Sequence, residues 1–498
     1  MKCFLGIDNG GTATKAAVFD SAGREMAVAS APTPVIQPKD GFMERDMDAL
    51  WTLTAQVIHK AVSQAGIKPE DIAGIGCTGH GKGLYLWGGD DRPVGYAIAS
   101  TDNRAAEIVS EWEKHEILDR AALLTCQRIR ACQPAALLSW IKQNRPEEYS
   151  RVKWVFEAKD YIRFMLTGEA FAELTDCSGT GLLNLHTKDY DPALLELFGI
   201  QEMQNKLPPL RKSHDLCGHV TARAAQECGL KEGTPVCGGM FDIDACAVAM
   251  DVSDESRLCA ITGTWSINEY LSKAPVELSK TTLNSLFCMP EFYLIEESSP
   301  TSAGNLEWVV DVFFGEQTRL WKKQGLSAYQ EADRLVDESL PADSDIVFLP
   351  FLYGSNAPGI EKAVFFGMNA ATTTGQLLRS VFEGVVFSHK RHIDRLLEYK
   401  NDFQAVRLAG GAAKSGVWVQ MFADILQLPV EVVTVKELGT LGACMAAAVA
   451  AGECKDYTEA AKAMSGEVKT VYPDKSLAPV YEEKYKKYCW LIQKLSAC

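Results

Sequence analysis

An aspartate followed by two glycines and a threonine stands near the start of the chain, and these residue types suit a phosphate site. The segment Asp8-Asn9-Gly10-Gly11-Thr12-Ala13-Thr14-Lys15 follows an apolar run over residues 4–7. Two glycines let the backbone direct its N–H groups toward an anion, while the hydroxyls and the lysine add donors and positive charge. A carboxylate among such donors makes chemical sense when a cation lies between it and the phosphates, so we expect Mg²⁺ near Asp8. Considered alone, the segment suits a plain β-hairpin with a glycine turn equally well.

A second aspartate, Asp242, follows a Gly-Gly pair at the end of another apolar segment, residues 238–241. Phosphoryl transfer to an alcohol needs positioning, charge stabilisation and a proton acceptor, and a carboxylate within hydrogen-bonding reach supplies the last of these. Asp244 lies two residues further on and should point elsewhere. The alternative is a helix N-cap on residues 243–250, which the segment taken by itself favours.

Two further glycine-rich segments compete for a nucleotide-binding role. Residues 74–79 fit G-x-G-x-x-G and residues 76–83 nearly fit the P-loop pattern, but both motifs must open a helix. The residues that follow, 84–87, are typical of a strand, which disfavours both motifs. Residues 408–415 instead run from a strand through Gly410 and Gly411 to Ser415 at the start of a helix. Small residues there would let a flat ring approach the backbone, although a tight strand–helix connection is the alternative.

Alternating strands and helices must position these candidates. Apolar runs predict strands over residues 4–7, 15–19, 26–29, 72–76 and 257–261, and helical periodicity predicts helices over 47–64, 105–114, 135–143, 160–166, 415–426, 439–451 and 481–495. Asp46 is placed to cap the first helix. Residues 439–451 are almost all small, which favours close packing on a sheet. After a polar connector, 251–255, a strand and a Gly263-Thr264 turn repeat the order of the first strand and turn, a short echo that would fit a duplicated domain.

Composition excludes several classes of protein. The 498 residues carry 50 basic and 65 acidic side chains, a net charge of −15, and 47% of them are hydrophobic. This length predicts roughly two to four domains, and the negative charge disfavours nucleic acid as a partner. No apolar run approaches the ~20 residues of a membrane span, and the N-terminus does not resemble a secretory signal. Fifteen scattered cysteines without a CxxC pair are typical of reduced thiols in the cytoplasm.

Over essentially the whole chain, the order of these segments resembles the FGGY family of carbohydrate kinases. Residues 363–368 (AVFFGM), followed after seven residues by 376–383 (QLLRSVFE), meet every defined position of one family signature. A second signature, around residues 134–144, is met in part: Trp140 is in place, but Leu137 stands where lysine is usual. The stretches 79–84, 301–308 (TSAGNLEW) and 348–356 (FLPFLYGSN) are most similar to bacterial L-xylulose kinases. Ser355-Asn356 replace the Glu-Arg of many relatives, which supports this subgroup.

The resemblance implies two α/β domains of the ribonuclease-H-like (actin-like ATPase) fold, residues 1–248 and 255–498, with a cleft between them. It implies an ATP- and Mg²⁺-dependent kinase of a small ketose or related polyol, above all L-xylulose. D-xylulose, ribulose, erythritol and a keto-sugar acid are alternative acceptors. A non-catalytic sugar-sensing protein of the same fold and a dinucleotide-dependent oxidoreductase are alternatives from other classes. The oligomeric state stays open, although a homodimer is common in the family.

The resemblance also assigns the site residues. Asp242 matches the catalytic base, and Asp8 lies where the metal is expected. The phosphate-binding positions are Asn9, Gly10, Gly11, Thr12, Lys15, Gly263 and Thr264, although Trp265 replaces a commoner small residue. The nucleotide-binding positions are Gly304, Gly410, Gly411 and Ser415, and the sugar pocket is expected around Gly79, His80, Asp102, Arg104 and Asp242. A structural role for His80, an ion pair of Arg104 with Glu107 and a packing role for Trp140 are the alternatives that need no substrate.

Overall fold

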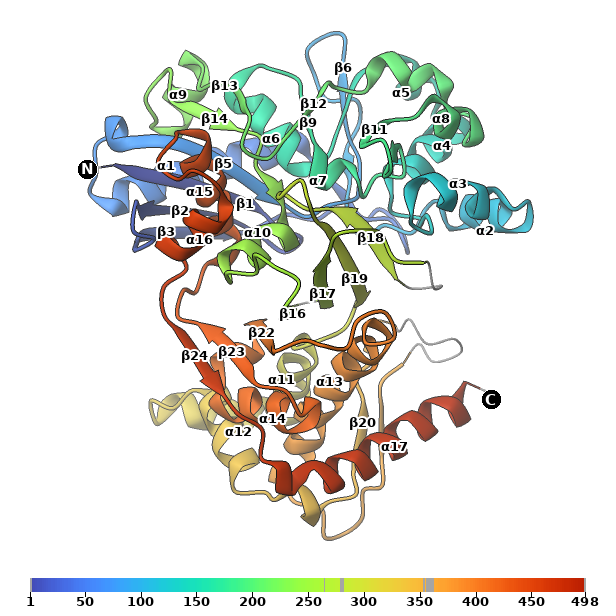
Figure 1. Cartoon of the computed structure of the whole chain (residues 1–498), viewed down its shortest axis with the longest axis vertical. Helices are drawn as coiled ribbons and strands as arrows, with labels where there is room; N and C mark the ends of the chain where they lie inside the picture. Colours follow the sequence, from blue (N-terminus) through green and yellow to red (C-terminus); the bar gives the residue numbers. More distant parts are fainter. Residues whose placement is uncertain (1, 264, 278–281, 353, 355–361, 497–498) are drawn as a thin grey trace. The chain divides into compact units, whose positions relative to one another are not determined.

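The computed structural model describes residues 2–263, 265–277, 282–352, 354 and 362–496 (Figure 1). The chain forms two compact units, and neither is contiguous in sequence. Unit 1 comprises Met1–Ser253, Ser272–Leu294 and Thr434–Gly466, and unit 2 comprises Asp254–Leu271, Ile295–Val433 and Glu467–Cys498. The division into domains 1–248 and 255–498 stays a prediction beside these compact units.

Unit 1 is built around a mixed sheet with the strand order β13-β14-β5-β1-β2-β3. Its strands are β1 (Cys3–Asn9), β2 (Ala13–Asp20), β3 (Glu25–Pro32), β5 (Ile72–Gly79), β13 (Leu216–His219) and β14 (Pro235–Cys237). The short strand β15 (Met240–Phe241) pairs with the end of β5. β1, β2 and β3 are antiparallel neighbours, whereas β5 runs parallel to β1. The strands predicted over residues 4–7, 15–19, 26–29 and 72–76 are confirmed.

Helices pack on both faces of this sheet. α1 (Met47–Ala65) and α6 (Ala158–Thr167) share one apolar core with Leu5 and Ile7 of β1. Asp46 caps α1 as predicted, by accepting a hydrogen bond from the Ala49 N–H at 2.9 Å. Because side chains alternate along a strand, Gly6 faces the opposite side, where α15 (Leu438–Ala450) packs on β1 and β5. The small residues predicted to pack closely on a sheet do so in α15.

Shorter elements complete unit 1. They are β4 (Glu44–Arg45), β6 (Tyr85–Gly88), β7 (Ala97–Ile98), α2 (Ala106–Lys114), α3 (Ile117–Thr125), α4 (Pro134–Asn144), α5 (Pro146–Arg151), β8 (Val152–Phe156), β9 (Ala172–Glu173), α7 (Leu174–Cys177), β10 (Leu183–Asn184), β11 (Asp189–Tyr190), α8 (Pro192–Leu197), β12 (Leu210–Arg211), α9 (Ala222–Cys228), α10 (Asp242–Ala249), β18 (Leu283–Leu286) and α16 (Tyr457–Met464). A second apolar core joins α2, α3, α4 and α8. The helices predicted over 105–114, 135–143 and 160–166 are α2, α4 and α6.

Unit 2 contains the strand order β19-β17-β16-β22-β23-β24. These strands are β16 (Arg257–Thr262), β17 (Ser266–Ser272), β19 (Tyr293–Ser299), β22 (Ala405–Gly410), β23 (Val430–Val433) and β24 (Val468–Val471). β16 is antiparallel to β17 and parallel to β22, the same relations that β1 has to β2 and β5. The sequence echo between the two strand–turn segments therefore corresponds to two hairpins in equivalent sheet positions.

Helices also cover the strands of unit 2. They are α11 (Gly304–Lys323), α12 (Ala328–Asp337), α13 (Thr374–Leu396), α14 (Gly416–Leu426) and α17 (Ala478–Leu495), with the strand pair β20 (Val347–Leu349) and β21 (Val364–Phe366). The helices predicted over 415–426 and 481–495 are confirmed as α14 and α17.

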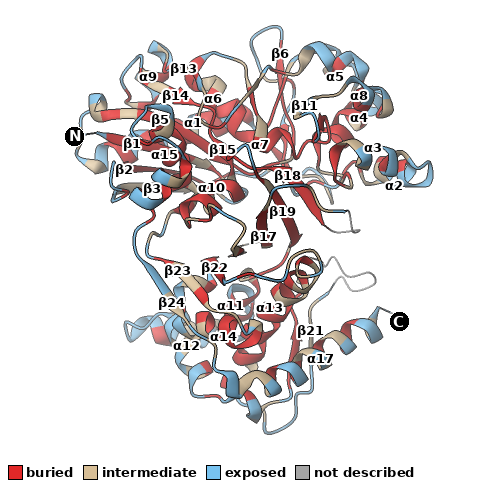
Figure 2. Ribbon diagram, viewed as in Figure 1, coloured by how far each residue is buried: buried red, intermediate tan, exposed pale blue. Residues whose placement is uncertain are grey.

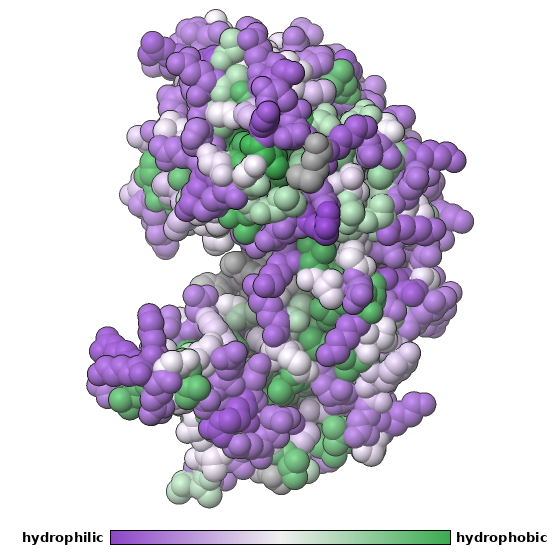
Figure 3. All heavy atoms as spheres, turned by 90° about the vertical axis from the view of Figure 1, so that its left-hand side faces the viewer, coloured by the Kyte–Doolittle hydropathy of each residue, from purple (hydrophilic) through white to green (hydrophobic). Residues whose placement is uncertain are grey.

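Burial follows the sheets. The central strands of each unit are mostly buried, and exposed residues concentrate on helices such as α2 and α17 (Figure 2). Polar side chains cover most of the face shown in Figure 3, with smaller apolar patches between them. Within the part of the chain that the structure describes, no helix has the length and apolar character needed to span a membrane.

Candidate active site

The predicted first phosphate loop leaves the sheet of unit 1 where β1 ends. Asp8 and Asn9 close β1 opposite Thr78 and Gly79 of β5, and the loop that follows leads into β2. Asp8 is partly buried, and its Oδ1 atom has no hydrogen-bond partner among the described residues. Burial raises the pKa of Asp8 to about 6, with Lys15 opposing the rise and Glu437 adding to it. An incompletely satisfied carboxylate at a strand end suits a hard cation.

Arg45, which no sequence pattern singled out, organises the same loop. Its buried guanidinium donates hydrogen bonds to the carbonyl oxygens of Gly10 and Gly11. The C=O and N–H groups of a trans peptide point in opposite directions. Holding these two carbonyls therefore turns the N–H groups of Gly11 and Thr12 away from Arg45. Gly11 and Thr12 are exposed, so the backbone donors expected for a phosphate are accessible.

The side chains of Asn9 and Lys15 already have partners within unit 1. Asn9 is buried, its Nδ2 donates to Thr54 Oγ at 3.0 Å and its carbonyl accepts from the His80 N–H, so that Asn9 holds the start of the loop within the sheet. Lys15 Nζ lies 2.8 Å from Glu437 Oε2. Burial acts to lower the pKa of Lys15, but Glu437 outweighs it, and the pKa rises overall. Lys15 is thus firmly cationic and would share its charge between Glu437 and a phosphate.

Asp242 lies at the same sheet edge as the Asp8 loop. Gly79 of β5 pairs with Asn9 on one side and with Phe241 of β15 on the other, and Asp242 follows directly. The N-cap position of α10 is Phe241, and no side chain caps this helix, so the interpretation of Asp242 as an N-cap is wrong. Asp244 is buried and turns elsewhere, accepting a hydrogen bond from the Cys288 N–H at 3.2 Å.

The surroundings of Asp242 make it a stronger base than an ordinary aspartate. Burial raises its pKa well above the usual range, Asp8 and Asp176 raise it further, and Lys82 opposes them. A proton acceptor works best when its pKa approaches the working pH. The side chain is only half-buried, so it combines a raised pKa with access to solvent.

His80 follows the end of β5 and is buried beside the loop. Its backbone N–H donates to the Asn9 carbonyl at 3.2 Å, and its Nε2 lies 3.0 Å from the Tyr85 hydroxyl. Burial lowers the pKa of His80 to about 3, and Arg45 contributes to the fall, so the imidazole is neutral. The ring therefore offers a hydrogen bond without charge. Its contact with Tyr85 is the structural role anticipated as the alternative.

Asp102 and Arg104 form a buried, bidentate ion pair. Arg104 donates from Nε to Asp102 Oδ1 at 2.9 Å and from Nη2 to Asp102 Oδ2 at 2.8 Å. Arg104 Nη1 also lies 2.8 Å from Glu44 Oε1. The alternative pairing with Glu107 is wrong, since these two acids occupy the guanidinium. Trp140 packs edge-on against Phe42, with ring centroids 5.6 Å apart, as a packing residue would.

In unit 2 the predicted nucleotide residues gather at the ends of β16 and β22. Gly410 ends β22 opposite Thr262, and the Gly411 N–H donates to the Thr262 carbonyl at 2.7 Å. A Cβ atom at Gly411 would lie 3.0 Å from the Ala303 side chain, which places this loop beside Gly304 at the start of α11.

Ser415 and the second glycine-threonine turn flank this loop. Ser415 Oγ caps α14 by accepting from the Trp418 N–H at 3.1 Å and donates to Asp333 Oδ1 at 2.7 Å. Gly263 directly follows β16, and its N–H donates to the Trp265 carbonyl at 3.2 Å. Thr264, together with Ser355-Asn356, lies outside the described residues. The structure thus brings Gly263, Gly304, Gly410 and Gly411 to one edge of the unit 2 strands.

A comparison with a solved structure establishes the fold of this chain. The chain matches ligand-bound xylulose kinase from Lactobacillus acidophilus with a TM-score of 0.89 at 23% identity, covering 100% of this chain and 99% of that one. The likeness confirms the predicted fold class, the two-domain actin-like ATPase fold of sugar kinases.

Sequence comparisons then identify the family. A model of the N-terminal domain of the FGGY family of carbohydrate kinases matches residues 3–249, and a model of its C-terminal domain matches residues 258–451. A probable L-xylulose kinase of Haemophilus influenzae is 38% identical over 99% of both chains. The L-xylulose/3-keto-L-gulonate kinase of Escherichia coli is also 38% identical, over 99% of this chain and 97% of that protein. The chain belongs to the FGGY family of carbohydrate kinases, as its motifs predicted, and is an ATP-dependent sugar kinase.

Proposed function

We propose that this sugar kinase phosphorylates L-xylulose, with a keto-sugar acid such as 3-keto-L-gulonate as a second acceptor, and that Asp242 is the general base. One observation carries the catalytic part: β5 holds the Asp8 loop on one side and β15, which ends at Asp242, on the other. The named activities of the relatives support the choice of acceptor. D-xylulose, ribulose and erythritol remain the alternative acceptors.

In the proposed reaction Asp242 receives the proton of the acceptor hydroxyl as the sugar oxygen bonds to the γ-phosphorus of ATP. The bond from the γ-phosphorus to the bridging oxygen breaks, and ADP leaves. The raised pKa of Asp242 strengthens its affinity for that proton. Activity is therefore expected to fall with decreasing pH as Asp242 becomes protonated. Gly79, neutral His80 and the Asp102–Arg104 ion pair would line the pocket for the acceptor sugar.

Mg²⁺ is the proposed metal, and Asp8 is the residue that would hold it. The fit rests on the Asp8 Oδ1 atom, which lacks a hydrogen-bond partner among the described residues. Mg²⁺ is commonly held by one or two carboxylates together with nucleotide phosphates, and when bound it would neutralise phosphate charge. Lys15 and the N–H groups of Gly11 and Thr12 would add positive charge and donors on the protein side.

For the nucleotide we propose the loops of unit 2. Thr262 supports this role because its hydroxyl accepts from the Ala412 N–H at 2.9 Å and donates to the Ala409 carbonyl at 2.7 Å, which fixes the backbone of the Gly410-Gly411 turn. Gly263, Thr264, Gly304 and Ser415 complete the proposed set. The same proposal includes domains 1–248 and 255–498, a homodimer and a cytoplasmic location, where ATP and reduced thiols occur together.

Sugar-dependent release of ADP tests the proposal. The purified chain would be assayed with MgATP and, in turn, L-xylulose, 3-keto-L-gulonate, D-xylulose, ribulose and erythritol. We expect kcat/KM for L-xylulose or 3-keto-L-gulonate to exceed the other values by at least about 10-fold, the discrimination that roughly 1.4 kcal/mol provides. A higher kcat/KM for D-xylulose would correct the acceptor. Absence of sugar-dependent ADP release with all five would favour the sugar-sensing alternative.

A further inference from the structure

The peptide group between Met240 and Phe241, one residue before the peptide that leads into Asp242, is held at both of its polar atoms. Thr78 Oγ on β5 donates to the Met240 carbonyl at 2.8 Å. On the other side of the same peptide, the Phe241 N–H donates to Thr175 Oγ of α7 at 2.9 Å. All of these contacts lie within unit 1. Two threonines from separate elements thus fix the orientation of the Met240–Phe241 peptide, which leads into Asp242.

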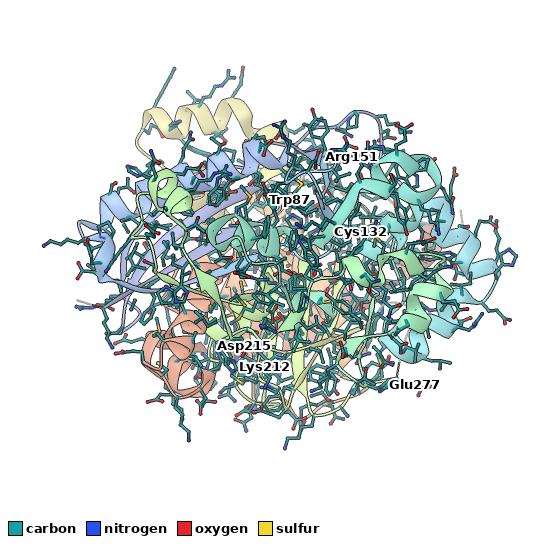
Figure 4. All side chains as sticks on the ribbon, turned by 90° about the horizontal axis from the view of Figure 1, so that it is seen from above. Trp87, Cys132, Arg151, Lys212, Asp215 and Glu277 are labelled. Atoms are coloured by element: carbon teal, nitrogen blue, oxygen red, sulfur yellow. The ribbon has the colours of Figure 1, made fainter. Side chains whose placement is uncertain are left out.

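The Gly-Gly pair that precedes this peptide is fixed as well. Arg163 Nη1 on α6 donates to the Gly238 carbonyl at 2.6 Å. The Gly239 N–H donates to the Ser213 carbonyl at 2.9 Å, and the Gly238 N–H donates to the Asp215 carbonyl at 3.0 Å. Asp215 lies beside Lys212 in the loop that supplies these carbonyls (Figure 4). The backbone of residues 238–241, which leads to Asp242, is therefore held by hydrogen bonds to neighbouring elements.

Three of these holding residues converge on one buried ionic cluster. Glu173 Oε2 accepts from Thr175 Oγ at 2.7 Å, and Glu173 Oε1 accepts from Ser213 Oγ at 2.8 Å. Lys159 Nζ lies 3.3 Å from Glu173 Oε2 and 2.8 Å from Asp160 Oδ1. Arg163 Nη1 lies 2.8 Å from the same Asp160 oxygen. The side chains of Lys159, Asp160, Arg163 and Glu173 are at most 1% exposed.

The two partners of the Thr175 hydroxyl determine in which hydrogen bond it donates and in which it accepts. A hydroxyl has one proton to donate, and an ionised carboxylate can only accept. The proton of Thr175 is therefore directed to Glu173, which leaves an oxygen lone pair facing the Phe241 N–H. Lys159 Nζ, 3.3 Å from the Glu173 Oε2 atom that accepts this proton, gives the buried carboxylate a cationic partner.

We propose that Thr175, oriented by Glu173, is a positioning residue for Asp242. The inference rests on the proposed role of Asp242 as the base. It adds that the buried ionic cluster around Lys159 helps to orient the Asp242 carboxylate. A displacement of about 1 Å at a reacting group can cost about 10²-fold in rate. Loss of the Thr175 hydroxyl is therefore expected to lower kcat much more than it changes the binding of ATP.

The test compares Thr175→Val with Thr175→Ser. Valine keeps the shape of threonine but leaves the Phe241 N–H without its acceptor, whereas serine keeps the hydroxyl. We expect Thr175→Val to lower kcat by about 10- to 100-fold, with the KM for ATP within about twofold of wild type, and Thr175→Ser to restore kcat to within about threefold. The kcat values are expressed per nucleotide-binding site, which corrects for unfolded protein. Thr234→Val is the matched control, because Thr234 is buried in unit 1 and its hydroxyl donates only to the Lys231 carbonyl, at 2.8 Å.

Each outcome separates this inference from the proposed function. An inactive Asp242→Asn variant alongside a Thr175→Val variant with wild-type kcat would overturn the positioning role and leave the base in place. A serine variant as slow as the valine variant would also overturn it, since the hydroxyl would then be irrelevant. Should Thr175→Val fail to fold, Ser213→Ala takes its place: it removes one hydrogen bond to Glu173 and keeps the Ser213 carbonyl. We expect it to lower kcat about 3- to 10-fold, and an unchanged kcat would contradict the proposal.

Discussion

Burial disfavours the ionised form of Asp8, and this lowers the stability of the folded protein at neutral pH. Its pKa in the folded protein is raised to about 6, whereas an aspartate in an unfolded chain titrates near 4. Between these pH values the folded state binds more protons than the unfolded state. The free energy of unfolding therefore falls as the pH rises through this window, and above pH 6 the ionised Asp8 costs on the order of 2 kcal/mol.

Asp8→Asn should accordingly stabilise the nucleotide-free protein while abolishing its activity. We expect the free energy of unfolding at pH 7.5 to rise by about 1–2 kcal/mol, because the neutral amide avoids the cost of a buried charge. Urea denaturation in the presence of a chelator measures it, and the difference from wild type should shrink at pH 4.5. A variant less stable than wild type at pH 7.5 would show that the Asp8 charge is already compensated in the free protein.

The sequence identified some of the site residues and missed others, for a physical reason. A local pattern singled out Asp8 and Asp242, since each stands at the end of an apolar segment beside paired glycines, and the family resemblance then assigned Asp242 as the base. Arg45 reaches Gly11 across 34 positions, and Glu437 reaches Lys15 across 422. Contacts at such separations leave no local periodicity or spacing. Only folding makes them visible.

At the scale of elements, the glycines of β5 show how a sequence motif can mislead. Residues 74–79 fit a dinucleotide-binding pattern, yet they lie inside β5 and β6 follows, which confirms the expectation that they do not open a helix. Gly76 has a different purpose. A Cβ atom there would lie 1.9 Å from the Ala443 carbonyl of α15. The glycine is what lets helix α15 approach the sheet.

Gly76→Ala should separate α15 from β5. The added methyl group meets backbone, which cannot rotate away, so we expect the free energy of unfolding to fall by about 2–3 kcal/mol. Gly89→Ala is the matched control, because an added Cβ atom there meets nothing within 4 Å and a change below about 0.5 kcal/mol is expected. Chemical denaturation of both variants measures the effect. Equal stabilities would contradict the packing argument.

At the scale of the whole molecule, the compact units do not follow the order of the chain. Helix α15 stands late in the sequence, where local patterns correctly predict a helix of small residues but do not indicate its partner. The structure places it on β1 and β5 of unit 1, more than 350 residues away in sequence. Composition and periodicity thus predict elements well, whereas their assignment to units depends on long-range packing.

This arrangement predicts how fragments behave. A fragment of residues 1–253 should fail to fold cooperatively, because one face of its sheet would lose α15 and expose apolar surface. Joining residues 434–466 to it through a flexible linker should restore at least part of the cooperative transition. Thermal unfolding followed by circular dichroism distinguishes the two fragments. A cooperative transition in the shorter fragment would show that α15 is dispensable.

The most direct test of the whole account is the turnover of Asp242→Asn with saturating MgATP and L-xylulose, measured together with ATP affinity. Asparagine keeps the size of the side chain and removes its ability to accept the proton. General base catalysis contributes about 10²- to 10⁴-fold, so we expect kcat to fall by at least about 10²-fold while the Kd for ATP changes by less than about threefold. A variant that binds ATP normally and turns over within about twofold of wild type would contradict the account.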